Sequence, residues 1–148
     1  MADYWVHNWD PFIVRFNDEW GIRWYGLAYI LGFLSLYIGL NKFYTWKWSP
    51  LNKAKISDFI IWIILGVLIG GRLGYCLFYD WDATYHNPLS IIDFWSSGGI
   101  SGMASHGGFI GVMMAILLFA RRHGYSFWLL ADNVTLLATL GLFFGRIA

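Results

Sequence analysis

Four ionisable residues, Arg72, His106, Asp132 and Arg146, interrupt long apolar stretches of the 148-residue chain. A histidine takes up or releases a proton near neutral pH, and an arginine binds anionic groups such as phosphate. Because a mid-helix arginine costs about 2.5–3.5 kcal/mol in lipid, such residues are candidates for a functional site. Asp132 differs from the other three, since we place it in the first turn of its helix, where a carboxylate suits the helix dipole.

Four apolar stretches of about 20 residues must position these side chains, each long enough to cross the ~30 Å hydrocarbon layer. The chain is 58% hydrophobic and 13% charged, which is typical of integral membrane proteins. We therefore predict an all-α membrane protein, one domain over residues 1–148 with about four transmembrane helices, at 24–44, 59–79, 100–120 and 127–147.

Composition also excludes several classes of protein. The net charge of +1 argues against a nucleic-acid partner. The single cysteine, Cys76, excludes an internal disulfide and a multi-cysteine metal site, and we predict that it is a packing residue. The first twenty residues contain no apolar core of a cleavable signal peptide.

Basic residues concentrate in two of the predicted connections: Lys42, Lys47, Lys53, Lys55, Arg121 and Arg122. The connection over residues 80–97 has none, and the N-terminal arm has two. The positive-inside rule therefore predicts an external N-terminus and helices of alternating direction. Tyr25, Arg72, His106 and Arg146 then all lie toward the outer leaflet.

Glycines four residues apart predict close helix packing, at Gly66, Gly70 and Gly74, at Gly107 and Gly111, and at Gly141 and Gly145. Arg72 lies about 200° around the helix from Gly70 and Gly74, so it points away from these glycines. It either faces a second, polar interior or extends to lipid phosphates.

Residues 96–108 are rich in glycine and serine, which are poor helix formers. We predict a broken or re-entrant start to the third helix, which lipid tolerates where the backbone is buried or faces water. His106 in this segment is placed to act as a general base. In the alternative interpretation it is an interfacial histidine that only satisfies a backbone carbonyl.

Motifs in a fixed order run along nearly the whole chain: Arg23-Trp24-Tyr25-Gly26-Leu27, Gly70-Gly71-Arg72-Leu73-Gly74-Tyr75, Met103-Ala104-Ser105-His106-Gly107-Gly108 and Gly145-Arg146-Ile147. In this set the chain resembles the N-terminal half of the bacterial phosphatidylglycerol–prolipoprotein diacylglyceryl transferases. The resemblance implies transfer of a diacylglyceryl group from phosphatidylglycerol to the lipobox cysteine in a prolipoprotein signal peptide, in the bacterial cytoplasmic membrane. It implies neither a cofactor nor a metal.

The resemblance also assigns roles to residues. His106 matches the family histidine proposed as the base that deprotonates the thiol. Arg146 and Tyr25 match residues that bind the phosphatidylglycerol head group, and Arg72 matches an arginine that is structural or binds the head group. Ser105, Gly107 and Gly108 belong to the histidine motif and shape its backbone.

The sequence departs from the family in extent, because family members have about seven membrane helices and a second essential arginine beyond the matched region. Met103-Ala104-Ser105-His106 also replaces the Met-Ser-Phe-His of many members. We expect the chain to be an N-terminal fragment that is inactive alone, and lipidation of a lipoprotein by these 148 residues would contradict this.

Two other classes of function remain open. A transport or channel subunit also has broken helices and buried charges, but its site faces both sides of the membrane. A structural membrane partner that associates through glycine faces would tolerate His106→Ala without functional loss.

Overall fold

The computed structural model describes residues 12–16, 21–87, 91 and 103–147. These residues form two short strands and five helices: β1 (Phe12–Arg15), β2 (Gly21–Arg23), α1 (Trp24–Thr45), α2 (Lys53–Phe78), α3 (Trp81–His86), α4 (Ser105–His123) and α5 (Phe127–Ile147). α1, α2 and α5 are each long and apolar enough to cross a membrane. The prediction of an all-α membrane protein is therefore confirmed.

The helix bounds differ from the predicted ones in two places. α2 begins at Lys53 and not near residue 59, because the polar residues assigned to a connection form its first turns. α4 runs from Ser105 to His123, and polar residues at both of its ends reduce its mean hydropathy below that of the three spanning helices. Of the predicted broken start at residues 96–108, residues 96–102 lie outside the described residues, and residues 105–108 form the regular first turn of α4. The β1–β2 hairpin and α3 were not predicted.

α2 and α4 pack so closely that their backbones touch. A Cβ atom added at Gly66 would lie 2.7 Å from the carbonyl oxygen of Gly111, and one at Gly74 would lie 2.6 Å from the Cα atom of Gly107. No side chain fits at such distances, so the predicted glycine packing is confirmed for this pair of helices. We call these contacts, with those of Gly70, the glycine seam.

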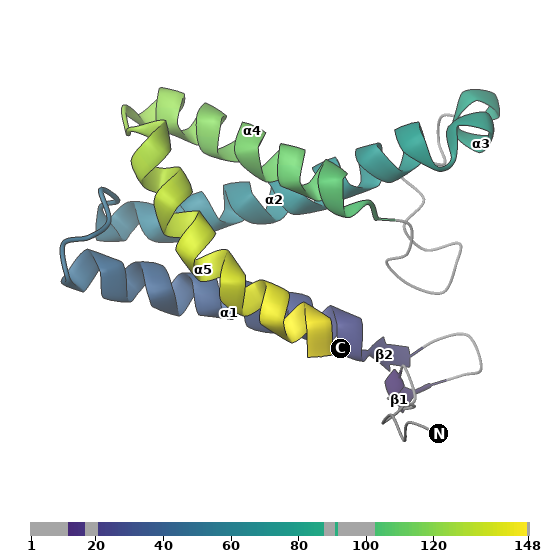
Figure 1. Cartoon of the computed structure of the whole chain (residues 1–148), viewed down its shortest axis with the longest axis horizontal. Coiled ribbons are helices and arrows are strands. Elements are labelled where there is room, and N and C mark those ends of the chain that lie inside the picture. Colours follow the sequence, from purple (N-terminus) through teal and green to yellow (C-terminus); the bar gives the residue numbers. More distant parts are fainter. Residues whose placement is uncertain (1–11, 17–20, 88–90, 92–102, 148) are drawn as a thin grey trace, which may run out of the picture.

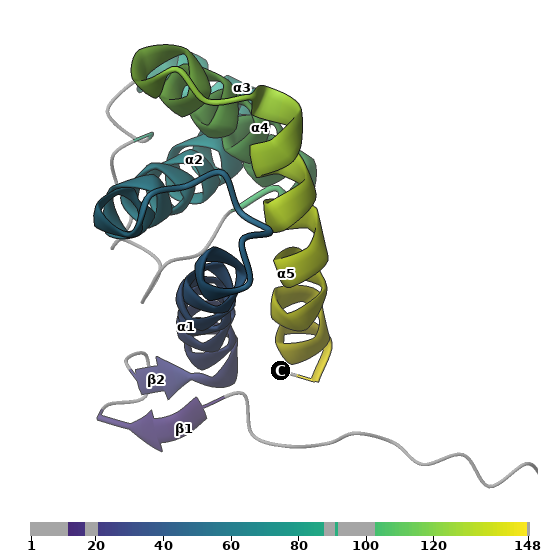
Figure 2. The same ribbon diagram turned by 90° about the vertical axis from the view of Figure 1, so that its left-hand side faces the viewer.

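α1 and α5 form a second antiparallel pair. A Cβ atom added at Gly32 would lie 3.3 Å from the Cα atom of Gly141, and one at Gly39 would meet the side chain of Leu137. Figures 1 and 2 show α5 starting beside α4 and crossing to run along α1. The two pairs meet at one end of the bundle and diverge toward the other (Figure 1).

The two helix pairs form a wedge, and the hydrophobic core of the described residues lies at the narrow end of this wedge. Its buried members come from the last half of α1, the first half of α2, the last half of α4 and the first half of α5, and include Leu40, Phe59, Phe119 and Leu130. The rings of Phe59 and Phe119 lie 4.8 Å apart at its centre. We call this the closed end, and the opposite end, where α1 and α4 begin, the open end.

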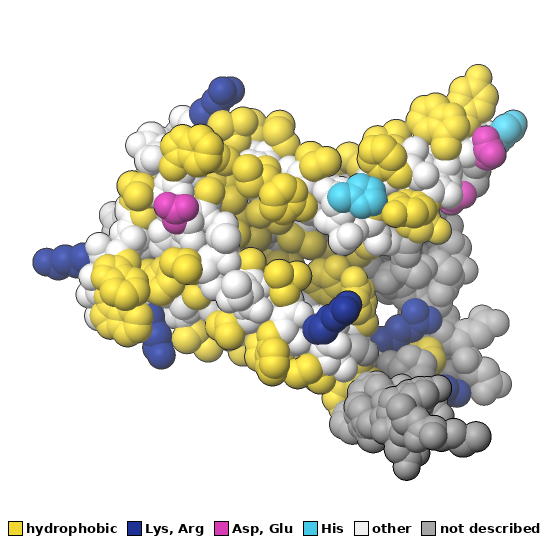
Figure 3. Space-filling model, in the orientation of Figure 1, with side chains coloured by type: hydrophobic (Ala, Val, Ile, Leu, Met, Phe, Trp, Pro, Cys, Tyr) yellow, Lys and Arg dark blue, Asp and Glu magenta, His cyan; other side chains and the backbone are white. Residues whose placement is uncertain are grey.

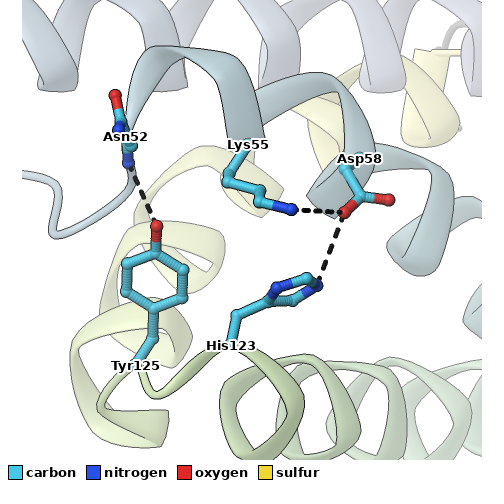
Figure 4. A network of polar contacts seen from close by, with 5 residues as sticks. All are labelled: Asn52, Lys55, Asp58, His123 and Tyr125. Carbon is cyan, nitrogen blue, oxygen red and sulfur yellow. Dashed lines mark hydrogen bonds and ion pairs between the residues drawn. The ribbon is translucent and has the colours of Figure 1, made fainter.

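Polar contacts join the connections at the closed end (Figure 4). The Asp58 carboxylate lies 3.5 Å from Nε2 of His123 and 3.7 Å from Nζ of Lys55. The backbone N–H of Asn52 donates to the Tyr125 hydroxyl at 3.4 Å, which links the α1–α2 connection to the α4–α5 connection. Along the rest of the bundle, hydrophobic side chains cover most of the visible face, and Lys and Arg gather toward its ends (Figure 3).

α1 and α4 both end with a residue in the left-handed region. In α4 this residue is Gly124 (φ 72°), whereas after α1 it is Lys47 (φ 61°). The backbone N–H of Trp48 donates to the Phe43 carbonyl (2.8 Å) and that of Lys47 to the Tyr44 carbonyl (3.1 Å), the bonds of a Schellman motif. Lys47 thus occupies the position where glycine is usual and carries backbone strain.

The glycine seam leads to a first prediction. Gly70→Ala should lower the free energy of unfolding by about 1–3 kcal/mol, since its Cβ would meet the backbone of Gly107 and Gly111. Gly26→Ala is the matched control, because nothing lies within 4 Å of a Cβ there. Thermal unfolding of the chain in detergent measures both changes. An equal change in the free energy of unfolding for the two variants would contradict close backbone packing at the glycine seam.

Lys47 leads to a second prediction. Lys47→Gly should raise the free energy of unfolding by about 0.5–1 kcal/mol, because it relieves the left-handed strain. Lys42→Gly, the same change inside the last turn of α1, should lower it by about 1 kcal/mol. Equilibrium unfolding measures both changes. A change in the free energy of unfolding in the same direction for both variants would contradict backbone strain at Lys47.

Candidate active site

A cavity of about 350 Å³ opens between α1, α2 and the start of α4, at the open end of the bundle. Its described lining consists of four tyrosines, two small or flexible apolar residues and one serine: Tyr25, Tyr29, Tyr75, Tyr79, Met103, Ala104 and Ser105. No charged side chain is among these lining residues. The cavity therefore offers hydroxyl groups on apolar walls, which suits an uncharged polar group joined to an apolar one.

The four tyrosines form two pairs, each spaced by one helical turn. The hydroxyls of Tyr25 and Tyr29 are hydrogen-bonded at 3.0 Å, and their rings meet edge to face at 5.0 Å. The rings of Tyr75 and Tyr79 are stacked at 5.8 Å. Because residues four apart share a helix face, α1 and α2 each present one pair to the cavity.

The entry into α4 is fixed to α2 by a backbone hydrogen bond. The N–H of Ala104 donates to the Gly71 carbonyl at 2.9 Å, and Met103 packs over Gly71, where a Cβ atom would lie 2.7 Å from its Cε. Ala104 is the N-cap residue and has no side-chain oxygen to cap the helix. The first turn of α4, with Ser105 and His106, therefore starts beside the cavity with its positive dipole end.

His106 lies next to the cavity but outside its described lining. Its ring centroid is 5.3 Å from that of Phe78, in an edge-to-face contact, and 5.9 Å from that of Tyr79. The side chain is otherwise exposed. Gly107 is buried in the glycine seam, and Gly108 follows on the same turn. Two aromatic rings at the end of α2 thus orient the imidazole at the rim of the cavity.

Arg72 is half buried and extends toward the connection between α3 and α4. Its Nε donates a hydrogen bond to the Ile91 carbonyl oxygen at 3.1 Å, and its Cζ lies 5.9 Å from the ring centroid of Tyr75. The guanidinium therefore lies over the ring of Tyr75, one of the residues that line the cavity. Arg72 therefore holds the connection between α3 and α4 through Ile91, and it also brings a positive charge near the cavity.

Arg146 is exposed in the last turn of α5 and is not part of the cavity lining. Gly141 of α5 lies against Gly32 of α1. Measured along the helix axes from this contact toward the open end, Arg146 is about 7 Å from Gly141, and Tyr25 is about 10 Å from Gly32. Asp132 is exposed in the second turn of α5. The prediction that it occupies the first turn is wrong, because α5 begins at Phe127.

The structure thus brings all four predicted residues, Tyr25, Arg72, His106 and Arg146, to one end of the bundle. Sequence reasoning missed Tyr29, Tyr75 and Tyr79 as cavity residues, although their spacing of four was a usable signal. Cys76 is 2% exposed, so its prediction as a packing residue is confirmed. Among the described residues, no group of three or more His, Cys, Asp or Glu side chains could hold a metal ion.

Comparison with known proteins gives one consistent result. The chain is similar to curated proteins named phosphatidylglycerol–prolipoprotein diacylglyceryl transferase. The Neisseria gonorrhoeae protein is 44% identical, over 95% of this chain and 48% of its own length. The Bdellovibrio bacteriovorus protein is 41% identical, over 97% of this chain and 41% of its own length. The Rhizobium meliloti protein of the same name is 41% identical over 94% of this chain and 50% of its own length. The chain thus spans about half the length of these relatives.

The sequence pattern of the prolipoprotein diacylglyceryl transferase family matches residues 11–148. With its three spanning helices, the chain is a multi-pass membrane protein. The match covers α1 to α5 and every residue of the open end described above. The chain therefore belongs to the prolipoprotein diacylglyceryl transferase family.

Proposed function

We propose that this chain forms the donor-lipid side of a site that transfers the diacylglyceryl group of phosphatidylglycerol to the lipobox cysteine of a prolipoprotein. The observation that carries the proposal is the tyrosine-lined cavity beside His106, at the end of the bundle that also holds Arg72 and Arg146. The names of the relatives supply the reaction, and the cavity supplies a place for its lipid donor.

The residues match what the reaction needs. The cysteine thiol must lose its proton, and His106 at the cavity rim would accept it. The thiolate sulfur then forms a bond to the terminal glycerol carbon of the diacylglyceryl group, and the bond from that carbon to the phosphate oxygen breaks. Glycerol-1-phosphate leaves with the bonding electrons, and a guanidinium near the phosphate stabilises the charge that develops there.

The cavity also fits the head group of the donor. The glycerol of phosphatidylglycerol is uncharged and carries hydroxyls, which phenol and serine hydroxyls bind, whereas the phosphate requires a cation. Tyr25 and Ser105 provide hydroxyls from different helices, and Arg146 provides charge at the same end. We assign Tyr25 to orientation of the head group and Arg146 to the phosphate.

We place the open end in the outer leaflet of the bacterial cytoplasmic membrane. Lys42, Lys47, Lys53, Lys55, Arg121 and Arg122 all lie at or beside the closed end, which the positive-inside rule assigns to the cytoplasm. The diverging helix pairs then admit a lipid sideways from one leaflet. A transport function is disfavoured, because the packed core around Phe59 and Phe119 fills the closed end.

The proposal is tested by complementation in cells depleted of their own transferase. We expect no rescue by the chain alone and rescue by a version extended with the C-terminal half of a relative. In the extended version, His106→Ala should lower lipidation by roughly 10²–10⁴-fold, the usual contribution of a general base. Lipidation is measured by the gel shift of a lipoprotein substrate, and membrane insertion by immunoblot.

His123→Ala is the matched control, because His123 lies on the same helix at the closed end and pairs with Asp58. It should insert and rescue growth. Rescue by His106→Ala at the level of His123→Ala would exclude a role for His106 as a base and would favour a structural partner.

The anchoring contact of Arg72 gives a further prediction. Arg72→Gln should remove the bond to Ile91 and raise hydrogen exchange in the peptide that contains Ile91, since a charged hydrogen bond contributes about 1.5–3 kcal/mol. Arg122→Gln, exposed at the far end of α4, should leave that peptide unchanged. Unchanged exchange in Arg72→Gln would leave head-group binding as the role of this residue.

A further inference from the structure

The β1–β2 hairpin exposes apolar side chains that the proposed reaction does not use. Val14 pairs with Ile22 across the two strands, and these side chains are 46% and 50% exposed. Phe16, just after β1, is 70% exposed, and Ile13 is 36% exposed. Apolar side chains grouped in this way on a short surface element indicate contact with a partner or a membrane.

The hairpin is joined directly to a membrane-spanning helix. β2 ends at Arg23, and α1 begins at Trp24 without a linker. At about 3.3 Å per strand residue, Ile22 and its partner Val14 lie within about 7 Å of the start of α1. The head-group layer is itself about 5–8 Å thick on each side of the hydrocarbon core, so Val14 and Ile22 fall within this layer when α1 begins at the edge of the core.

The polar side chains of the hairpin suit the same environment. Both strands carry an arginine, Arg15 in β1 and Arg23 in β2. Their guanidinium carbons lie 4.9 and 5.1 Å, respectively, from the ring centroid of Phe12. Arginine stacks on aromatic rings and binds phosphate, and it reaches polar head groups while its stem stays on apolar surface. Apolar and cationic groups therefore occur together on this short element.

We propose that the β1–β2 hairpin is a membrane-surface anchor, embedded in the phospholipid head-group layer with Val14, Phe16 and Ile22 toward the acyl chains. The partner is the lipid layer and not a protein, because β2 runs without a linker into α1, a helix that is long and apolar enough to span a membrane. Since Arg23 precedes Tyr25 by two residues, the anchor fixes the depth of the tyrosine cavity. Only this last consequence rests on the proposed function.

The test is spin-label accessibility of the 148-residue chain in phosphatidylglycerol–phosphatidylcholine nanodiscs. Buried Cys76 is first changed to alanine, and single cysteines are introduced at Phe16 and Ile22. Ile30, on the exposed face of α1, is the lipid control, and Asn52, in the exposed α1–α2 connection, is the water control. Oxygen reports lipid contact and a nickel chelate reports water contact, and thermal unfolding checks the fold of each variant.

The expected oxygen-to-nickel ratio at positions 16 and 22 lies above that of Asn52 and below that of Ile30, as for a label in the head-group layer. Val14→Asp with Ile22→Asp should shift the label at position 16 toward the nickel chelate. A ratio equal to that of Asn52, or low access to both reagents, would overturn the anchor. The anchor would also be overturned if the oxygen-to-nickel ratio of the label at position 16 were the same with and without the two aspartate substitutions.

Discussion

Backbone contact between α2 and α4 is the constraint on which the rest of the structure depends. Gly66, Gly70 and Gly74 meet Gly107 and Gly111 at distances that admit no side chain. This approach allows Ala104 to bond the Gly71 carbonyl and sets the first turn of α4 against the end of α2. In lipid, where apolar surface alone gives little drive for helix association, such close packing supplies the dispersion energy that holds the pair together.

The wedge follows from where large side chains are available. Phe59, Phe119 and Leu130 fill the closed end, whereas glycines and tyrosines dominate the open end. The two helix pairs diverge toward the open end, and a cavity of about 350 Å³ lies there, lined by described residues of α1, α2 and the start of α4. The uneven distribution of large side chains along four helices therefore accounts for a cavity at the open end, and the β1–β2 hairpin lies at that same end.

The sequence predicted much of this arrangement. Antiparallel alternation of helices was enough to place Tyr25, Arg72, His106 and Arg146 at one end, and four-residue glycine spacing predicted the seam. It could not predict that His106 and Arg146 lie outside the cavity lining, or that Arg72 bonds Ile91, because these depend on side-chain directions set by tertiary packing. The start of α2 at Lys53 was missed because its polar first turns resemble a connection, and the hairpin because its strands span only a few residues.

Placement of the phosphatidylglycerol head group at the open end is tested most directly by photo-crosslinking. A phosphatidylglycerol with a diazirine on its head group, reconstituted with the chain, should label peptides that contain Tyr25 and Tyr29, Tyr75 and Tyr79, and Ser105. A phosphatidylcholine probe with the same diazirine should label them several-fold less. Labelling centred on the α1–α2 connection, or equal labelling of the cavity peptides by both probes, would contradict a head-group site in the tyrosine-lined cavity.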